Sequence, residues 1–230
     1  MKQMFPARKH GNKGRIMANN EIIAVTSQKL CTRPFLEQLE RVAGQRPKAI
    51  MLREKDLPEE TYERLAGEVL TLCRNYDVEL ILHNFPAVAE KLGVRTVHLP
   101  LGELRKFRDE SGAVGISEDR TNIGCSVYSK EVAEGMTGHS LNIGCSVHSP
   151  EEAKEAEQLG AAYLTAGHIY ATDCKPDIPP RGLSFLREVC RSVTIPVYAI
   201  GGIGLKGGRL EEVMEAGAKG ACVMSDFMRV

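Results

Sequence analysis

The sequence carries no net charge, and this absence excludes several classes of partner. Thirty Lys and Arg residues balance thirty Asp and Glu residues in a chain of 230 residues. Without an overall field of either sign, the composition does not favour a nucleic acid or an acidic membrane surface. We therefore expect no nucleic-acid partner and no membrane partner, and a small molecule is the better expectation for a ligand.

Long apolar runs and paired cysteines are also absent. No apolar run approaches the roughly 18 residues that a membrane-spanning helix requires, and no signal-peptide core precedes a cleavage site. The seven cysteines stand singly, without the close pairs of a zinc site or the density of a small disulfide-rich secreted protein. We expect a reduced, cytoplasmic protein with no cofactor of the structural-zinc kind.

The chain does contain a repeated alternation of short β-branched runs with longer stretches of helical period. This alternation is typical of βα units and a parallel sheet, and at this length it predicts a single (β/α)8 TIM barrel domain of the α/β class. The expected strands are Ile22–Thr26, Lys48–Arg53, Val78–Leu82, Arg95–Leu99, Leu141–Val147, Ala162–Gly167, Ile195–Ile200 and Lys219–Met224. The expected helices are Pro34–Ala43, Pro58–Asn75, Pro86–Leu92, Leu101–Glu110, Pro150–Leu159, Leu183–Ser192 and Gly208–Ala216.

Two segments interrupt this rhythm. Residues 1–20 carry only basic charges and no apolar periodicity, so we expect a disordered basic extension ahead of a barrel over residues 21–230. An insert at about 111–140 contains Asn122–Val127, which has the same sequence as Asn142–Val147. Only one copy can occupy the barrel, and we expect the second, because His148-Ser-Pro-Glu-Glu leads directly into an amphipathic helix. With the first copy in its place, Tyr128 would replace His148, and a phenol with a pKa of about 10 is a poor base at neutral pH.

A glycine pair predicts an anion site. The apolar run Ile195–Ile200 ends at Gly201 and Gly202, which allow positive φ and a close approach of backbone N–H groups to a ligand. A second apolar strand ends just before Ser225 and would complete the cradle. In (β/α)8 barrels, a phosphate is often bound by the loops after the last two strands.

Further polar residues follow the other strands, at the ends where barrel enzymes place their chemistry. His148 is the sharpest candidate for general acid/base work, because imidazole exchanges protons near neutral pH. His98 lies inside an apolar strand and is expected to be structural. The proline-rich loop between Lys175 and Arg181 could close over an anionic ligand, although solvated surface charge explains it equally well. The remaining candidates are Arg53, Glu54, Lys55, His83, Asn84, Glu103, Ser146, His168 and Thr172.

Six motifs resemble, in order and spacing, the thiamine phosphate synthase/TenI superfamily of (β/α)8 barrels. They extend over nearly all of the chain from Ile22 to about Phe227 except the insert. The strongest single match is the run Gly167-His-Ile-Tyr-Ala-Thr-Asp-Cys-Lys175. The motifs are Arg53–Leu57, Leu82–Asn84, Val97–Leu99, Gly144–Ser149, Gly167–Lys175 and Tyr198–Ile203.

The resemblance implies two activities, and the run at Gly167–Lys175 favours the TenI-like thiazole tautomerase. This enzyme aromatises a thiazole carboxylate phosphate by proton transfer and needs no metal. By family analogy, His148 would shuttle the proton, and Lys175 or Arg53 could face the carboxylate. Gly201, Gly202 and Ser225 would hold the phosphate of the small-molecule thiazole.

The alternative is a thiamine phosphate synthase, which couples hydroxymethylpyrimidine diphosphate to thiazole phosphate with Mg²⁺. At the family's metal-binding acids this chain has Phe85 and Glu103, so Glu103 is the metal ligand only under the synthase hypothesis. The residues that still match the substrate-binding pattern are Arg53, Lys55, Asn84, Ser146 and Lys175. A third hypothesis is a non-catalytic regulator that binds thiazole phosphate, and family members are often homo-oligomers.

Overall fold

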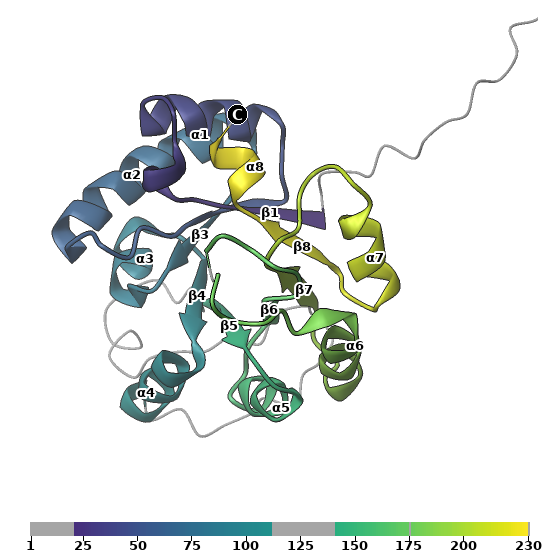
Figure 1. Ribbon diagram of the computed structural model, residues 1–230. Coiled ribbons are helices and arrows are strands. Elements are labelled where there is room, and N and C mark those ends of the chain that lie inside the picture. The colour runs from purple at the N-terminus through teal and green to yellow at the C-terminus, as the bar shows by residue number, and fades with distance from the viewer. Residues whose placement is uncertain (1–20, 112–140, 175, 230) are drawn as a thin grey trace, which may run out of the picture.

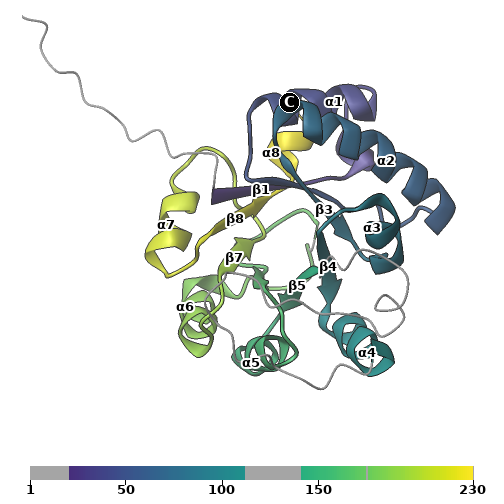
Figure 2. The ribbon, with the colours of Figure 1, turned by 180° about the vertical axis from the view of Figure 1, so that it is seen from behind.

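The chain folds as a closed barrel. The computed structural model describes residues 21–111, 141–174 and 176–229. Eight parallel strands close in the order β1 to β8, and the helices surround them (Figures 1 and 2). This confirms the predicted (β/α)8 barrel. The predicted extension over residues 1–20, residues 112–140 of the insert, and Lys175 lie outside the described residues.

Each predicted strand is present, within a few residues of its expected ends. Every strand is hydrogen-bonded in parallel to its neighbours, and β8 pairs with β1 through Cys222 opposite Ile23. Closure leaves no unpaired edge in the sheet. The strands are β1 (Ile22–Val25), β2 (Ala49–Leu52), β3 (Glu79–His83), β4 (Thr96–Pro100), β5 (Asn142–Val147), β6 (Tyr163–Gly167), β7 (Val197–Ile200) and β8 (Gly220–Val223).

The predicted helices are present as well, and two short helical elements were not predicted. These two are η2 (Gln28–Leu30) and α8 (Ser225–Met228), which contain three and four residues and are too short for a periodic signal. The other helices are α1 (Phe35–Gly44), α2 (Glu59–Tyr76), α3 (Pro86–Leu92), α4 (Leu101–Ser111), α5 (Pro150–Gln158), α6 (Gly182–Ser192) and α7 (Arg209–Glu215).

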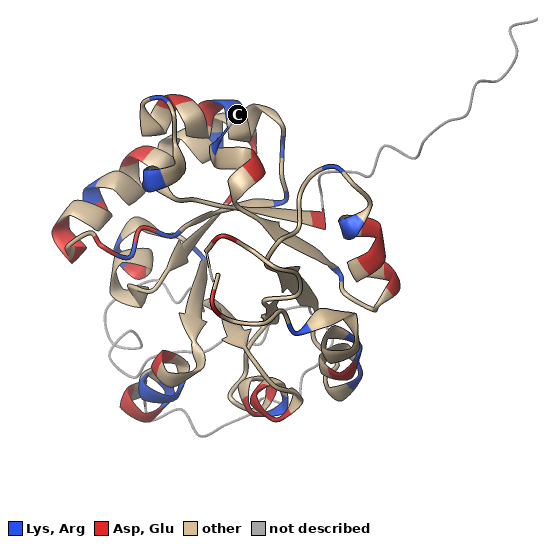
Figure 3. Ribbon diagram, viewed as in Figure 1, with Lys and Arg blue, Asp and Glu red and all other residues tan. Residues whose placement is uncertain are grey.

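The strands are buried on both faces, which explains their nearly continuous apolar sequences. Outward-facing side chains pack under the helices, and inward-facing ones such as Ile23, Met51 and Tyr198 fill the barrel. Figure 3 shows the charged residues mainly on the helices and loops around the strands. In the described part of the chain, no helix is long and apolar enough to cross a membrane.

The second copy of the duplicated sequence is the one in the barrel. Asn142–Val147 forms β5, where Cys145 lies opposite Leu99 of β4 and Leu164 of β6. The predicted choice between the copies is confirmed. His148 therefore follows β5 directly, at the carboxyl end of a barrel strand. The first copy lies outside the described residues.

Candidate active site

The barrel brings the predicted site residues to one end. All strands run parallel, so the residues that follow them face the same mouth. Arg53 follows β2 and Asn84 follows β3. Ser146 is the second-last residue of β5. Gly201 and Gly202 follow β7, and Ser225 begins α8.

A buried hydrogen-bonded network lies inside the barrel below this mouth, on strands β4 to β6. The His98 ring, 1% exposed, has its Nδ1 3.1 Å from the Tyr163 hydroxyl and its Nε2 2.8 Å from Ser146 Oγ. Ser146 Oγ also lies 3.2 Å from Thr165 Oγ1. The predicted structural role of His98 is thus consistent with its burial. The network fixes the Ser146 hydroxyl, because its neighbours leave it little freedom to rotate.

Gly144 makes room for this network. A Cβ atom at position 144 would lie 2.5 Å from the Tyr163 hydroxyl oxygen and closer still to the ring. Sequence reasoning did not identify Tyr163 and Thr165 as part of the site. The available signal was the pair of inward-facing polar residues two positions apart in β6, opposite Gly144 and Ser146 of β5.

We expect Gly144→Ala to destabilise the protein by about 1 to 3 kcal/mol, because the added methyl group must displace the Tyr163 ring. Urea unfolding followed by circular dichroism measures the change. Gly67→Ala is the matched control, since a Cβ on Gly67 in α2 would meet no atom within 4 Å in the described part of the chain. That control should stabilise the helix by up to about 1 kcal/mol. Equal stability of Gly144→Ala and the wild type would contradict the packing argument.

Two buried histidines, His83 at the end of β3 and His98 in β4, are held neutral. Burial lowers the pKa of His83 to about 3, and the nearby positive charges of Arg53 and Lys55 add to this effect. Burial also lowers the pKa of His98 to about 3, with smaller contributions from His83 and Arg53. Neither histidine can act as a general acid near neutral pH.

His148 lies in a different environment from these two. Its side chain is 44% exposed, and its Nδ1 is 3.4 Å from Glu152 Oε2. The same carboxylate oxygen accepts a 2.6 Å hydrogen bond from the His148 backbone N–H. Ser149 caps α5 by accepting a hydrogen bond from Glu152 N, so Glu152 is itself positioned by the helix start. A carboxylate that contacts one ring nitrogen helps to orient the imidazole.

Glu54, which the sequence placed among the polar residues of the mouth, is part of the scaffold. Its Oε1 accepts a 2.6 Å hydrogen bond from Thr26 Oγ1, and both carboxylate oxygens accept from Gln28 N. Thr26 Oγ1 in turn accepts from Arg53 N at 2.9 Å. These bonds join the segment after β1 to the end of β2. They fix the backbone from which the Arg53 side chain extends.

The glycine pair after β7 has the geometry that the sequence predicted. Gly201 has φ +106° and Gly202 has φ +67°. A Cβ on Gly201 would lie 2.9 Å from His168 Cα, and one on Gly202 would lie 2.8 Å from Tyr170 Cβ. Both positions therefore require glycine for conformation and for space.

The loop after β7 is tied to α8, which carries Ser225. Asp226 Oδ2 accepts a 2.8 Å hydrogen bond from Leu205 N. Ile200 of β7 also lies opposite Cys222 of β8, so the chain leaves these two strands at neighbouring points. The loop that begins at Gly201 and Gly202 and the helix that begins at Ser225 are thus held together, and the phosphate cradle stays a prediction.

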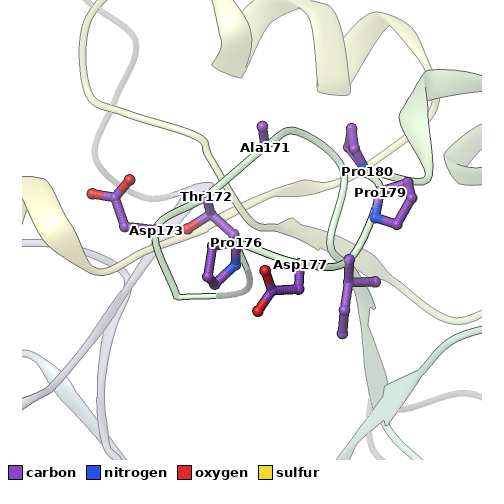
Figure 4. Close-up of a pocket in the computed structure, with 8 residues that line it drawn as sticks. Ala171, Thr172, Asp173, Pro176, Asp177, Pro179 and Pro180 are labelled. Atoms are coloured by element: carbon purple, nitrogen blue, oxygen red, sulfur yellow. The ribbon is translucent and has the colours of Figure 1, made fainter.

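A cavity of about 430 Å³ lies within the loop between β6 and α6 (Figure 4). His168 holds this loop, since its Nε2 lies 3.1 Å from the Ile178 carbonyl oxygen. The charged residues that line the cavity are Asp173 and Asp177, so its described lining does not attract an anion. Arg181 lies with its guanidinium carbon 5.2 Å from the Phe185 ring centroid. The lining residues are Ala171, Thr172, Asp173, Pro176, Asp177, Ile178, Pro179 and Pro180.

The oxygen donors at the mouth fit a magnesium ion only when a substrate supplies further oxygens. Phe85 follows Asn84, and its ring packs 4.6 Å from the Tyr62 ring. Asn84 Oδ1 is buried and has no hydrogen-bond partner among the described residues, and Glu103 Oε1 lies 2.9 Å from Lys106 Nζ. Within residues 21–111, 141–174 and 176–229, no cluster of three His, Cys, Asp or Glu residues could hold a metal. One carboxylate, one amide oxygen and substrate phosphates match the way Mg²⁺ is usually bound.

Comparison with known proteins identifies the family of this chain. A family model described as thiamine monophosphate synthase matches residues 22–135 and 111–227. The thiamine-phosphate synthase of Enterococcus faecalis is 30% identical over 199 residues, which cover 84% of this chain and 79% of that protein. The thiamine-phosphate synthase of Fusobacterium nucleatum is 26% identical over 211 residues, with coverages of 90% and 89%.

A solved structure agrees with the sequence relatives. The thiamine phosphate pyrophosphorylase from Pyrococcus furiosus superposes with a TM-score of 0.68 at 29% identity, covering 93% of this chain and 89% of that chain. The shared barrel and the two matched segments point the same way. The chain belongs to the thiamine monophosphate synthase family.

Proposed function

We propose that this protein is a thiamine-phosphate synthase, which couples hydroxymethylpyrimidine diphosphate to thiazole phosphate. The observation that carries the proposal is the family match over nearly the whole chain, to relatives that bear this name. It reverses the order of the two hypotheses drawn from the sequence, in which the tautomerase came first. The charges at the mouth agree with it, because a diphosphate needs positive charge around it.

Each mouth residue has a role in this reaction. Gly201, Gly202 and Ser225 hold the thiazole phosphate, and Ser146, fixed by His98, orients the reacting rings. Arg53 and Lys55 neutralise the diphosphate, and the same role extends to Lys175 outside the described residues. A dissociative displacement builds negative charge on the leaving pyrophosphate, so these cations stabilise the transition state more than the ground state.

Magnesium would be held by Glu103 and Asn84 together with oxygens of the substrate. The buried, unpartnered Asn84 Oδ1 supports this arrangement. When bound, the ion supplies further neutralisation of the leaving pyrophosphate.

A second candidate is the metal-independent thiazole tautomerase. The specific observation in its favour is the pair formed by His148 and Glu152, an oriented and solvent-accessible imidazole at the end of β5. Phe85 also supports it, because an aromatic ring stands where a second metal-binding acid would be expected. Transfer of a proton between two carbons of one small ring system needs a single acid/base group and a phosphate anchor.

Two assays on the purified protein decide between these functions. The first supplies both coupling substrates with and without Mg²⁺ and follows thiamine phosphate. We expect product only with the metal, and a loss of about tenfold or more in Glu103→Gln. Glu110→Gln, an exposed acid later on α4, is the matched control and should retain the wild-type rate. Product formation that is indifferent to both chelator and Glu103→Gln would overturn the magnesium role.

The second assay supplies the thiazole carboxylate tautomer in the presence of a chelator. Aromatic thiazole that forms there, and is lost in His148→Ala, would establish the tautomerase in place of the synthase. If neither assay yields product but the protein binds thiazole phosphate measurably, the result would instead support the non-catalytic regulator.

A further inference from the structure

Arg209, at the start of α7, contacts both the glycine turn after β7 and the loop after β6. Its Nη1 donates a 2.5 Å hydrogen bond to the Gly202 carbonyl oxygen, and its guanidinium carbon is 4.7 Å from the centroid of the Tyr170 ring. The Tyr170 hydroxyl donates to Glu212 Oε2 at 2.5 Å. Burial, followed by this carboxylate, raises the pKa of Tyr170 to about 12, so the phenol remains a neutral donor. The loop after β6, the turn after β7 and the start of α7 are joined through these side chains.

These contacts determine which atoms of the turn remain available to a ligand. The Gly201 carbonyl accepts a 3.0 Å hydrogen bond from Tyr170 N, and the Gly202 carbonyl accepts from Arg209. Carbonyl oxygens repel an anion, whereas backbone N–H groups attract it. With both carbonyls engaged by protein donors, the turn cannot easily rotate to present an oxygen to the ligand.

The position of Arg209 in its helix is unfavourable for a positive charge. Arg209 is the first residue of α7, where the positive end of the helix dipole disfavours a cation. Glu211 and Glu212 follow the usual preference for acids in this first turn. The unfavourable position of the guanidinium is offset by the Gly202 carbonyl and the Tyr170 face, since Arg stacks on aromatic rings.

We propose that Arg209 is a positioning residue of the phosphate site, which holds the Gly201–Gly202 turn ready for a phosphate monoester and adds positive charge beside it. Tyr170 assists by holding the guanidinium in place. The inference rests on the proposed function in one respect, namely that the anion bound at this turn is the phosphate of the thiazole substrate.

Binding measurements on Arg209→Ala test this role. Calorimetry would use inorganic phosphate, thiazole phosphate and the unphosphorylated thiazole alcohol as probes. We expect affinity for both phosphate-bearing probes to fall about tenfold, since a charge-assisted hydrogen bond at the site is lost. Affinity for the alcohol should not change, which a merely structural role would not predict. Lys206→Ala removes a nearby cation from the loop that precedes α7 and is the matched control, with wild-type phosphate affinity expected.

Arg209→Gln provides a second variant in case the alanine form folds poorly, because it can still donate to the Gly202 carbonyl without carrying charge. We expect its phosphate affinity to lie between those of the wild type and Arg209→Ala. Equal losses for phosphate and alcohol probes, an equal loss in Lys206→Ala, or a wild type that binds no phosphate would each overturn the inference. If phosphate binding depends on Arg209 while both turnover assays are silent, the proposed function fails and the inference stands.

Discussion

Gly201→Ala should abolish turnover of a phosphorylated thiazole, with a loss of about a hundredfold or more, because it disrupts the turn in two independent ways. A φ of +106° is accessible to glycine and strained for alanine. The new Cβ would also lie 2.9 Å from His168 Cα and 3.2 Å from Ile169 N, which are backbone atoms that cannot rotate away. The turn must therefore move away from the loop after β6. Steady-state kinetics with the phosphorylated and unphosphorylated thiazoles would measure the effect.

Gly207→Ala separates the two causes. Gly207 lies on the same loop with φ +95°, but a Cβ there would meet no atom of the described residues within 4 Å. This variant bears a similar backbone strain of about 1 to 2 kcal/mol without the steric clash. We expect it to lower stability and leave phosphate recognition intact. If both variants lost activity equally, general destabilisation would explain the result, and the local role of Gly201 would be rejected.

The strand pattern could be predicted from sequence because each strand is buried on both faces. Such strands read as short apolar runs bounded by polar helices, and their order along the chain is also their order around the barrel. The two copies of Asn-Ile-Gly-Cys-Ser-Val are identical in sequence, so only their context distinguished them. Ser149 and Glu152 provided that context, since a helix N-cap three residues before a glutamate marks the start of α5.

The candidate site was predicted mainly from residues at strand ends or soon after them. Gly201, Gly202 and His148 are of this kind, and the structure places them at the strand ends. Contacts between distant elements gave no local signal. The bonds from Arg209 to Gly202 and from Asp226 to Leu205 join residues whose side chains could have pointed elsewhere. Glu54 looked like a mouth residue in the sequence, and only the three-dimensional structure shows its carboxylate bound to Thr26 and Gln28.

The two buried histidines predict that the fold loses much of its stability in mild acid. In the unfolded chain a histidine has a pKa of about 6.5, whereas His83 and His98 have pKa values of about 3 when folded. Between these values the unfolded state binds protons that the folded state excludes, so stability falls as the pH decreases. The contribution is fully present above about pH 6.5 and is lost progressively toward pH 3. At pH 5, each histidine should account for a loss of about 2 kcal/mol, or about 4 kcal/mol for the pair.

Urea unfolding at pH 7.5 and pH 5 would measure this loss of stability. The variant His83→Gln shows how much of the loss comes from His83. Glutamine does not titrate, so the variant should lose about 2 kcal/mol less than the wild type between the two pH values. Carboxylates contribute equally to both proteins and cancel in the comparison. Val213→Ala, a buried truncation in α7, lowers stability without removing a titrating group and should keep the wild-type pH dependence. An unchanged pH dependence in His83→Gln would mean that the His83 ring reaches solvent in the folded state, and the burial that lowers its pKa would then be wrong.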